Sequence, residues 1–331
     1  LKSCPSDYIY DRVIFKVTVM GEKLDIITIG ESLIELSSGM SLAYADTLEK
    51  YYGGDTLCTA VAAARLGSKA GYITRVGNDP FREFLMDSWQ LEGLDISNVK
   101  LIDGFNGVYF IGHPEFEKKE FVYYRKKTAA TKLSIDDIST AYIHSADMIY
   151  ATGVTQSLSL SAKETVKKAY QIAKENNMIT AYDTNFDCRL WGTEDAKDAF
   201  DEISDYIDIM FLSLEHDVTK LFEIDSPDKC IKAMWDKGIK TVVVKSAKDH
   251  GYFVGYEGDI TFVKFYTDEI VDSTGSGDAF NGAFLHGINS GMTPFEAARL
   301  ASIDAGLQCH GMGAIKSIPY KEQVYAAYYG Q

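Results

Sequence analysis

The chain has 331 residues, of which 46% are hydrophobic and 24% charged, a composition typical of a folded globular protein with a large core. Its formal net charge of −15 excludes broad binding to nucleic acid or anionic membranes, whose phosphates it would repel. The five cysteines form neither a C-x-x-C pair nor a zinc-binding pattern, and no stretch is apolar for long enough to span a bilayer. We therefore expect a cytoplasmic protein with reduced thiols and no nucleic-acid or membrane partner.

Residues 1–22 precede the first convincing strand and are expected to form an N-terminal extension. From residue 23 to residue 331, strand-like and helix-like segments alternate, which predicts one α/β domain with a doubly wound, mostly parallel sheet. Helices are expected over 57–66, from a capping box at Ser161 towards Asn176, and after a second capping box at Thr293. Buried strands are expected at 26–29, 71–76, 148–151, 179–183, 209–212 and 241–245.

Two segments, about 32–52 and 106–126, interrupt this alternation with aromatic and alternating residues such as Val108-Tyr109-Phe110-Ile111. They read as short antiparallel strands that could meet as a small second sheet. Such a sheet could form a lid that keeps water out of a transfer reaction.

A glycine pair, Gly53-Gly54, stands directly before the expected helix at 57–66. Taken alone, a glycine pair at this place is ordinary turn chemistry. A second glycine cluster near the other end of the chain suggests instead that two such turns enclose one substrate.

The second cluster is Asp272-Ser-Thr-Gly-Ser-Gly-Asp278, which follows an expected strand and loop at 265–271. Phe280, Ala283, Phe284 and Ile288 recur at helical spacing after it, so the glycines lie where a helix begins. Unpaired amides and the helix dipole favour an anion there. The chain has no G-x-x-x-x-G-K-[ST] motif and no dinucleotide fingerprint, which disfavours an NAD enzyme.

The stretch from Gly53 to Gly67 resembles the first signature of the PfkB (ribokinase-like) carbohydrate kinases, and 272–282 resembles the second. The resemblance extends from about residue 25 to the C-terminus. It implies a ribokinase-like fold and ATP-dependent phosphorylation of a sugar hydroxyl with Mg²⁺, and a monovalent cation could also take part. On this basis Asp278 is the expected general base, and the amides of Gly275, Ser276 and Gly277 are the expected anion hole.

Within that family, Tyr123 to Leu133 is similar to the Y-Y-R-K-x-x-A-A-x-K-L stretch of 2-keto-3-deoxygluconate kinases. Asp183 to Trp191 resembles their D-x-N-[YF]-R-x-x-L-W. The tyrosines could equally be packing residues of the lid. The expected contacts of the sugar are Gly53, Gly54, Asp55, Tyr109, Tyr123, Arg125 and Asp278.

The sequence also departs from these patterns. Asp187 stands where the family motif has an arginine that resembles a carboxylate ligand, and it would repel a substrate carboxylate. Arg189 or Lys126 could substitute, or the substrate could be a neutral sugar, as in a fructokinase or another hexose kinase. Cys58 replaces a usual asparagine. These departures keep open a protein that binds sugar or nucleotide without chemistry.

The family position of other residues implies a nucleotide site. Glu215 or Asp217 could support the metal, and we leave that choice open. Exposed aromatic strands in the lid favour a homo-oligomer, for which a dimer through the lid is a reasonable arrangement. The expected ATP contacts are Ser213, Lys245, Ala247, Gly251, Gly275, Gly277 and, near the adenine, Ser302.

Overall fold

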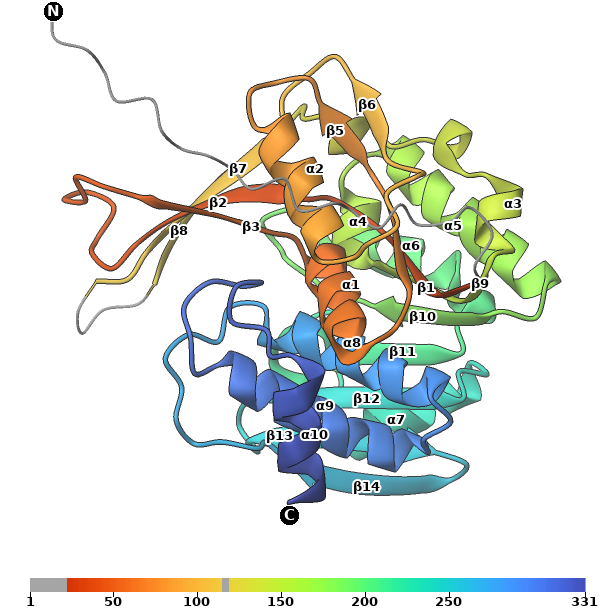
Figure 1. Ribbon diagram of the computed structural model, residues 1–331. Coiled ribbons are helices and arrows are strands. Elements are labelled where there is room, and N and C mark those ends of the chain that lie inside the picture. Colours follow the sequence, from red (N-terminus) through yellow and green to blue (C-terminus); the bar gives the residue numbers. More distant parts are fainter. Residues whose placement is uncertain (1–22, 115–118, 331) are drawn as a thin grey trace, which may run out of the picture.

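The computed structural model describes residues 23–114 and 119–330 (Figure 1). The expected N-terminal extension, 1–22, lies outside the described residues. An eight-stranded sheet forms the centre of the molecule and is parallel except at one edge, where β13 and β14 run antiparallel. Its strands, in spatial order, are β14 (Asp259–Lys264), β13 (Gly251–Tyr256), β12 (Thr241–Ser246), β11 (Ile209–Ser213), β10 (Ile179–Asp183), β9 (Ala146–Thr152), β1 (Leu24–Ile29) and β4 (Ala70–Ile73).

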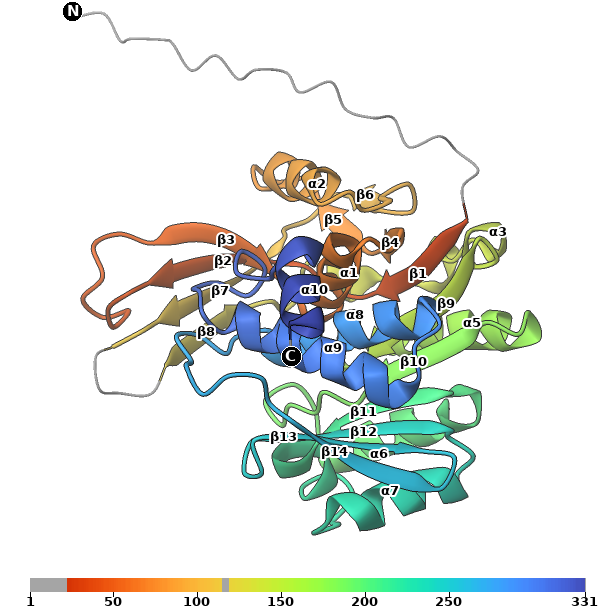
Figure 2. The ribbon, with the colours of Figure 1, turned by 60° about the horizontal axis from the view of Figure 1, so that its bottom comes forward.

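Helices cover both faces of this sheet because successive residues of each strand point to opposite sides. Val243 packs into one core, whereas Val242 and Val244 pack into the other. Figure 2 shows α9 and α7 on opposite sides of β11 to β14. The first face carries α1 (Asp55–Leu66), α2 (Arg82–Leu91), α8 (Ser276–Asn289), α9 (Pro294–Gln308) and α10 (Lys321–Tyr329), and the second carries α3 (Thr140–Ile143), α5 (Leu160–Glu175), α6 (Thr193–Asp201) and α7 (Pro227–Asp236).

Three local predictions need correction. The strand expected at 71–76 is divided, because β4 ends at Ile73 and β5 (Arg75–Gly77) pairs with β6 (Lys100–Ile102) in a separate two-stranded sheet. No strand lies within 265–271, since β14 ends just before it. The helix expected to start at Ser161 starts earlier, because the hydroxyl of Ser159 accepts the Ala162 amide at 3.1 Å.

The capping box at Thr293 is confirmed. Its hydroxyl accepts the amide of Glu296 at 3.3 Å, and the carboxylate of Glu296 accepts the amide of Thr293 at 2.9 Å. This reciprocal pair satisfies two amides that the helix itself leaves without partners. Pro294 occupies the first helical position, where its missing N–H costs nothing.

A second, smaller sheet projects from the main body (Figure 1). Its order is β3-β2-β7-β8, and its own small core consists of Leu33, Tyr109 and Ile111. The pair β2–β7 is parallel, which corrects the expectation of antiparallel strands only. The two sheets together confirm the expected α/β architecture. The strands of the small sheet are β2 (Leu33–Ser38), β3 (Glu49–Gly53), β7 (Gly107–Gly112) and β8 (Glu120–Tyr124).

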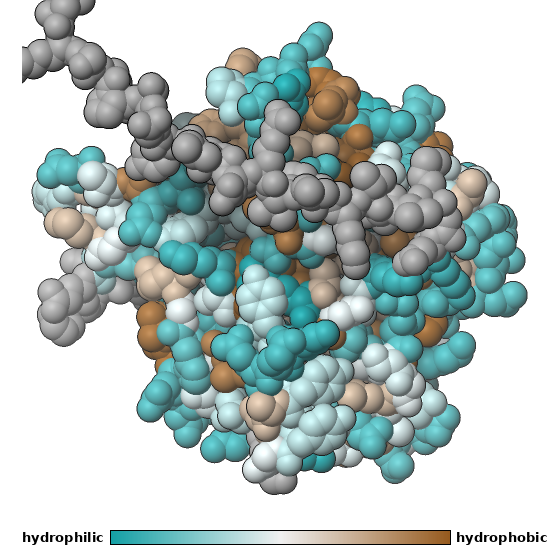
Figure 3. Space-filling view, viewed as in Figure 1, coloured by the Kyte–Doolittle hydropathy of each residue, from teal (hydrophilic) through white to brown (hydrophobic). Residues whose placement is uncertain are grey.

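Hydrophilic side chains predominate on the face shown in Figure 3, where apolar ones gather only in small groups. In the described part of the chain, every helix is too short or too polar to cross a membrane.

Candidate active site

The glycine turn lies at the start of α8, as the sequence predicts. Gly275 precedes the helix with a φ of 80°, a left-handed backbone conformation that residues other than glycine rarely adopt. A Cβ atom on this glycine would also lie 3.2 Å from atoms of Ala314. Within the described residues, the amides of Gly275 and Gly277 have no hydrogen-bond partner, whereas the Ser276 amide donates to the Ser273 carbonyl at 3.2 Å. Two amides at this helix start can therefore receive an anion.

Two cavities lie on either side of this turn. The first, which we call the Asp55 cavity, has a volume of about 210 Å³ and is lined by Gly54, Asp55, Gly275 and Asp278, among others. The second, which we call the Lys245 cavity, has a volume of about 520 Å³ and is lined by Ser276, Gly277 and Lys245, among others. The turn thus forms the boundary between the two cavities.

Asp278 and Asp55 lie close together in the Asp55 cavity. The Asp55 carboxylate accepts the Thr152 hydroxyl at 2.5 Å and is 3.4 Å from the side-chain amide of Asn185. Burial raises the pKa of Asp278 well above its ordinary value; the charges of Asp55 and Asp183 raise it further, and Lys245 opposes them. Burial likewise raises the pKa of Asp55. One carboxyl of this pair therefore keeps its proton to a higher pH than an exposed aspartate would, as a group that exchanges protons with a substrate should.

Lys245 lies beneath the turn in a buried polar network. Its ammonium donates to Asp183 at 2.7 Å and to the side-chain oxygen of Asn281 at 3.3 Å. The amide nitrogen of Asn281 donates to Asp183 at 2.7 Å and to the hydroxyl of Tyr150 at 3.0 Å. A Cβ atom on Gly277 would lie 3.5 Å from the ammonium group, so the lysine places a positive charge beside the turn.

Sequence reasoning gave no site role to Asp183 or Asn281, although both lie in stretches that resemble the family, and it missed one further carboxylate. Asp183 ends a predicted strand and Asn281 lies in the second signature, but neither position was assigned a contact. Glu31 was also missed: its carboxylate accepts Nε of Arg125 at 2.8 Å and is almost wholly buried. Burial raises the pKa of Glu31, and Arg125 opposes the rise. Arg125 lines the Asp55 cavity, and its guanidinium is already paired with Glu31.

The tyrosines of the small sheet combine packing with a place at the cavity. Tyr109 and Tyr123 stack with ring centroids 5.6 Å apart and both line the Asp55 cavity. The hydroxyl of Tyr109 donates to the buried carboxylate of Glu35. Gly53 does not line the cavity; a Cβ atom there would lie 2.6 Å from the Tyr109 hydroxyl. A Cβ atom on Gly54 would clash with the carbonyl oxygen of Glu31.

Asp187 is paired with a neighbour in its own loop. Arg189 donates to the two carboxylate oxygens through Nε at 2.8 and 2.9 Å and through Nη2 at 2.5 Å. The Arg189 guanidinium also lies 5.2 Å from the ring centroid of Tyr123. Both charged residues line the Asp55 cavity, as does the buried Cys58. A guanidinium thus lies two residues after position 187, and it is paired with the Asp187 carboxylate.

The Lys245 cavity collects most of the residues expected around the nucleotide: Ser213, Lys245, Ala247, Gly251 and Gly277. Gly275 lines the Asp55 cavity instead. Ser302 lines neither of these cavities. Its buried hydroxyl donates to the carbonyl of Lys264 at 2.8 Å, and it lies beside a separate hollow of about 430 Å³.

The two candidate metal ligands are in different surroundings. Glu215 lines the Lys245 cavity and accepts the backbone amide of Lys248 at 3.0 Å. Asp217 is buried and accepts the amides of Phe186 at 2.8 Å and Ser213 at 2.6 Å, so it organises backbone. Burial raises its pKa to about 7. The described residues contain no group of three or more His, Cys, Asp or Glu side chains that could hold a metal ion alone.

The sequence is similar to known proteins over most of its length. A family model described as pfkB family carbohydrate kinase matches residues 16–321. The chain is 29% identical over 303 residues to a 2-dehydro-3-deoxygluconokinase of Thermoproteus tenax, covering 89% of this chain and 91% of that protein. It is also 29% identical over 320 residues to a 5-dehydro-2-deoxygluconokinase of Clostridium beijerinckii, covering 91% and 92%.

Solved structures show the same fold. A PfkB protein from Polaromonas sp. JS666 superposes with a TM-score of 0.82 at 25% identity, covering 92% of this chain and 99% of that one. A 2-dehydro-3-deoxygluconokinase from Thermotoga maritima superposes with a TM-score of 0.85 at 22% identity, covering 93% and 100%. A putative ribokinase II of E. coli, in complex with ATP and Mg²⁺, gives 0.84 at 23%, covering 93% and 99%. At such identities the last two likenesses show the fold alone.

Proposed function

The chain belongs to the pfkB family of carbohydrate kinases, and we propose that it transfers the γ-phosphoryl group of ATP to a hydroxyl of 2-keto-3-deoxygluconate. The position of Asp278 carries this proposal. Its carboxyl lines one cavity, while Gly277 and Lys245, on the same turn or beneath it, line the other. A sugar in the Asp55 cavity and a nucleotide in the Lys245 cavity would meet at this turn.

The transfer follows from this arrangement. The acceptor hydroxyl gives its proton to Asp278, and its oxygen forms a bond to the γ-phosphorus while the bond to the β–γ bridging oxygen breaks and ADP leaves. The amides of Gly275 and Gly277 receive charge on the transferred group, together with the dipole of α8. Lys245 adds a positive charge beneath the turn. Asp55 accepts a hydrogen bond from the sugar and holds it against Asp278.

The expected divalent ion fits this chain only as a partner of the nucleotide. Glu215 is the carboxylate that lines the Lys245 cavity, and one carboxylate is what Mg²⁺ uses when substrate phosphates and water supply its other ligands. When bound, Mg²⁺ neutralises charge on the phosphates. Glu215 would hold it through water or directly, and Asp217 would keep the adjoining backbone in place.

The choice of a sugar acid rests on the relatives and on two guanidinium groups. The names of the two relatives compared above refer to keto-deoxy forms of gluconate, which carry a carboxylate. In this chain Arg125 and Arg189 line the Asp55 cavity. A substrate carboxylate would be received by Arg189, whose guanidinium would then be shared between the substrate and Asp187.

A neutral sugar is the second candidate, and the pairing of Asp187 with Arg189 favours it. That pair already satisfies the guanidinium, and Asp187 is an acceptor suited to a sugar hydroxyl. On this alternative the protein is a fructokinase or another hexose kinase of the family.

An ADP-release assay over a panel of sugars separates these candidates. The proposal expects turnover of 2-keto-3-deoxygluconate to exceed that of fructose by kcat/KM. Turnover of fructose without turnover of any keto-deoxy acid would establish the second candidate. Binding of sugar and ATP without ADP release would instead indicate a non-catalytic binding protein.

We also propose that two copies associate through the small sheet and that the protein works in the cytoplasm. Along β8, Phe121, Val122 and Tyr124 are exposed, and an uncovered strand of this kind invites pairing. A mass measured by light scattering should be that of a dimer, and Val122→Lys should lower it. A monomeric mass for the wild-type protein at all working concentrations would contradict the dimer.

A further inference from the structure

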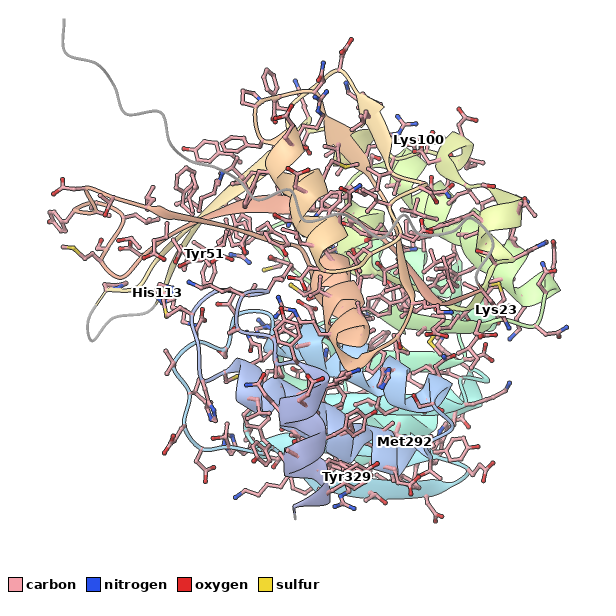
Figure 4. The ribbon with its side chains drawn as sticks, in the orientation of Figure 1. Lys23, Tyr51, Lys100, His113, Met292 and Tyr329 are labelled. Carbon is pink, nitrogen blue, oxygen red and sulfur yellow. The ribbon has the colours of Figure 1, made fainter. Side chains whose placement is uncertain are left out.

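One ion pair joins the small sheet to the glycine turn. Lys119 directly precedes β8, and its ammonium lies 2.5 Å from the carboxylate of Asp272, the residue that opens the turn. The side chain of Asp272 is 1% exposed and that of Lys119 is 29% exposed, so this is not a solvated surface pair. His113, which directly follows β7, also lies at this end of the small sheet (Figure 4).

Asp272 organises the turn through three further hydrogen bonds. One oxygen accepts the amide of Thr274 at 2.9 Å and its hydroxyl at 2.7 Å, and the other accepts the amide of Gly313 at 3.2 Å. Thr274 and the residue after Gly313, Ala314, line the Asp55 cavity with Gly275. The carboxylate thus fixes the backbone of the turn and that of the neighbouring segment at Gly313.

Asp272 needs a positive charge to do this. Burial alone would raise its pKa, but the bonds from Lys119 and Thr274 hold the pKa below the ordinary value. A second buried carboxylate, Glu35, lies near enough for the two charges to repel. His113 also faces the pair, and burial lowers its pKa, so at neutral pH it supplies no charge. In the described part of the chain, Lys119 is the cation paired with Asp272.

We propose that Lys119 is a positioning residue for phosphoryl transfer, which supplies from the small sheet the positive charge that holds Asp272 and the turn in the form that receives the phosphoryl group. The inference rests on the proposed function. A consequence is that a free monovalent cation, which the family resemblance suggested, is not needed at this carboxylate, because a tethered ammonium occupies it.

Three variants test the proposal. Lys119→Met removes the charge at similar length, Lys119→Arg keeps a charge, and Lys50→Met is the matched control. Lys50 belongs to the same small sheet, but its ammonium lies 3.9 Å from the centroid of the Phe84 ring instead of on a carboxylate. We expect Lys119→Met to lower kcat roughly tenfold or more while changing the sugar KM by less than about threefold. Lys119→Arg and Lys50→Met should stay within about threefold of wild type.

Added cations give the sharpest readout. Ammonium or potassium ions should restore part of the kcat lost in Lys119→Met, and should leave the wild-type rate unchanged at constant ionic strength. A purely structural lysine would show no such rescue. Unchanged kcat in Lys119→Met, or an equal loss in Lys50→Met, overturns the proposal.

Hydrogen exchange separates this inference from the proposed function. Amides 273–278 should exchange faster in Lys119→Met than in wild type or Lys50→Met, whether or not any sugar is phosphorylated. Failure of the wild-type protein to release ADP with every sugar refutes the kinase proposal. Equal exchange in all three proteins refutes the role of Lys119.

Discussion

Asp55 is the first residue of α1, Asp278 lies in the first turn of α8, and the side chains of both residues face one cavity. The hydroxyl of Thr59 fixes the two helix starts together, since it lies 3.2 Å from the carbonyl of Asp55 and 3.1 Å from that of Asp278. Two carboxyl groups buried in this way cannot both ionise easily. Their proximity favours a single proton held between them, and the proposed mechanism assigns the base to Asp278 and a hydrogen bond from the sugar to Asp55.

Replacement of Asp278 by Asn should remove the base and keep the shape of the cavity. We expect kcat to fall by about 10²- to 10⁴-fold, the usual contribution of general-base catalysis. Binding of ATP and sugar, measured by calorimetry, should change little. Asp136→Asn, which alters an exposed acid far from the turn in sequence, is the control. A rate for Asp278→Asn close to that of wild type would remove this carboxyl from the mechanism.

The rate should depend on pH in a direction set by the raised pKa of Asp278. Because burial and the charge of Asp55 both favour the protonated acid, kcat/KM should rise with pH to a midpoint above the ordinary range of aspartate. In Asp55→Asn the like charge is absent, so the midpoint should move to lower pH. Asp55→Asn will also weaken binding, so the comparison uses the pH midpoints of the two profiles and not the absolute rates. A midpoint that stays in place, or moves upward, contradicts the coupling.

Removing the charge of Asp187 should reveal what Arg189 binds. In Asp187→Asn the guanidinium keeps a hydrogen-bonding neighbour but loses its counter-charge. If a substrate carboxylate is received there, KM for 2-keto-3-deoxygluconate should fall by about threefold to tenfold, a modest change because this pair is partly exposed. KM for fructose should rise or stay constant. Equal effects on both sugars would argue against Arg189 as the carboxylate ligand.

Asp304 should make the protein less stable as the pH rises. It is fully buried in α9, and neither carboxylate oxygen has a hydrogen-bond partner within the described residues. Burial raises its pKa well above the ordinary value, so the folded protein holds the proton more tightly than the unfolded chain. The contribution to stability is therefore full below the ordinary pKa of aspartate and is lost as the pH rises towards the raised pKa.

Asp304→Asn cannot ionise and should lack this loss. The melting temperature of the variant relative to wild type should be higher at pH 8 than at pH 5. Asp136→Asn, at an exposed position, should show no such difference. If the difference in melting temperature between Asp304→Asn and wild type is the same at both pH values, Asp304 does not hold its proton.

The elements that sequence reasoning placed correctly depend on local patterns. The strand expected at 179–183 is β10, because a short apolar run bounded by polar residues is enough to identify a buried strand. The helix start at Gly275 was also predictable, because a glycine turn followed by apolar residues at helical spacing is a local sequence pattern. The position of Asp278 beside Asp55 required only that two such starts meet.

What sequence reasoning missed depends on tertiary contacts. The Glu31–Arg125 pair joins residues 94 apart, and the Lys119–Asp272 pair joins residues 153 apart. Neither partner carries a local mark of the other, because an ion pair is defined by where the chain folds and not by spacing. The adenine contact expected of Ser302 stays a prediction: its hydroxyl donates to the carbonyl of Lys264, and the residue does not line the Lys245 cavity.

The central claim is that a sugar hydroxyl beside Asp278 receives the γ-phosphoryl group of ATP. Phosphorus NMR of the protein with ATP, Mg²⁺ and 2-keto-3-deoxygluconate tests it most directly. The account predicts one new phosphomonoester signal that grows with ADP in equal amounts and is absent with Asp278→Asn. Release of inorganic phosphate alone, or the same phosphomonoester at the same rate from the variant, would contradict it.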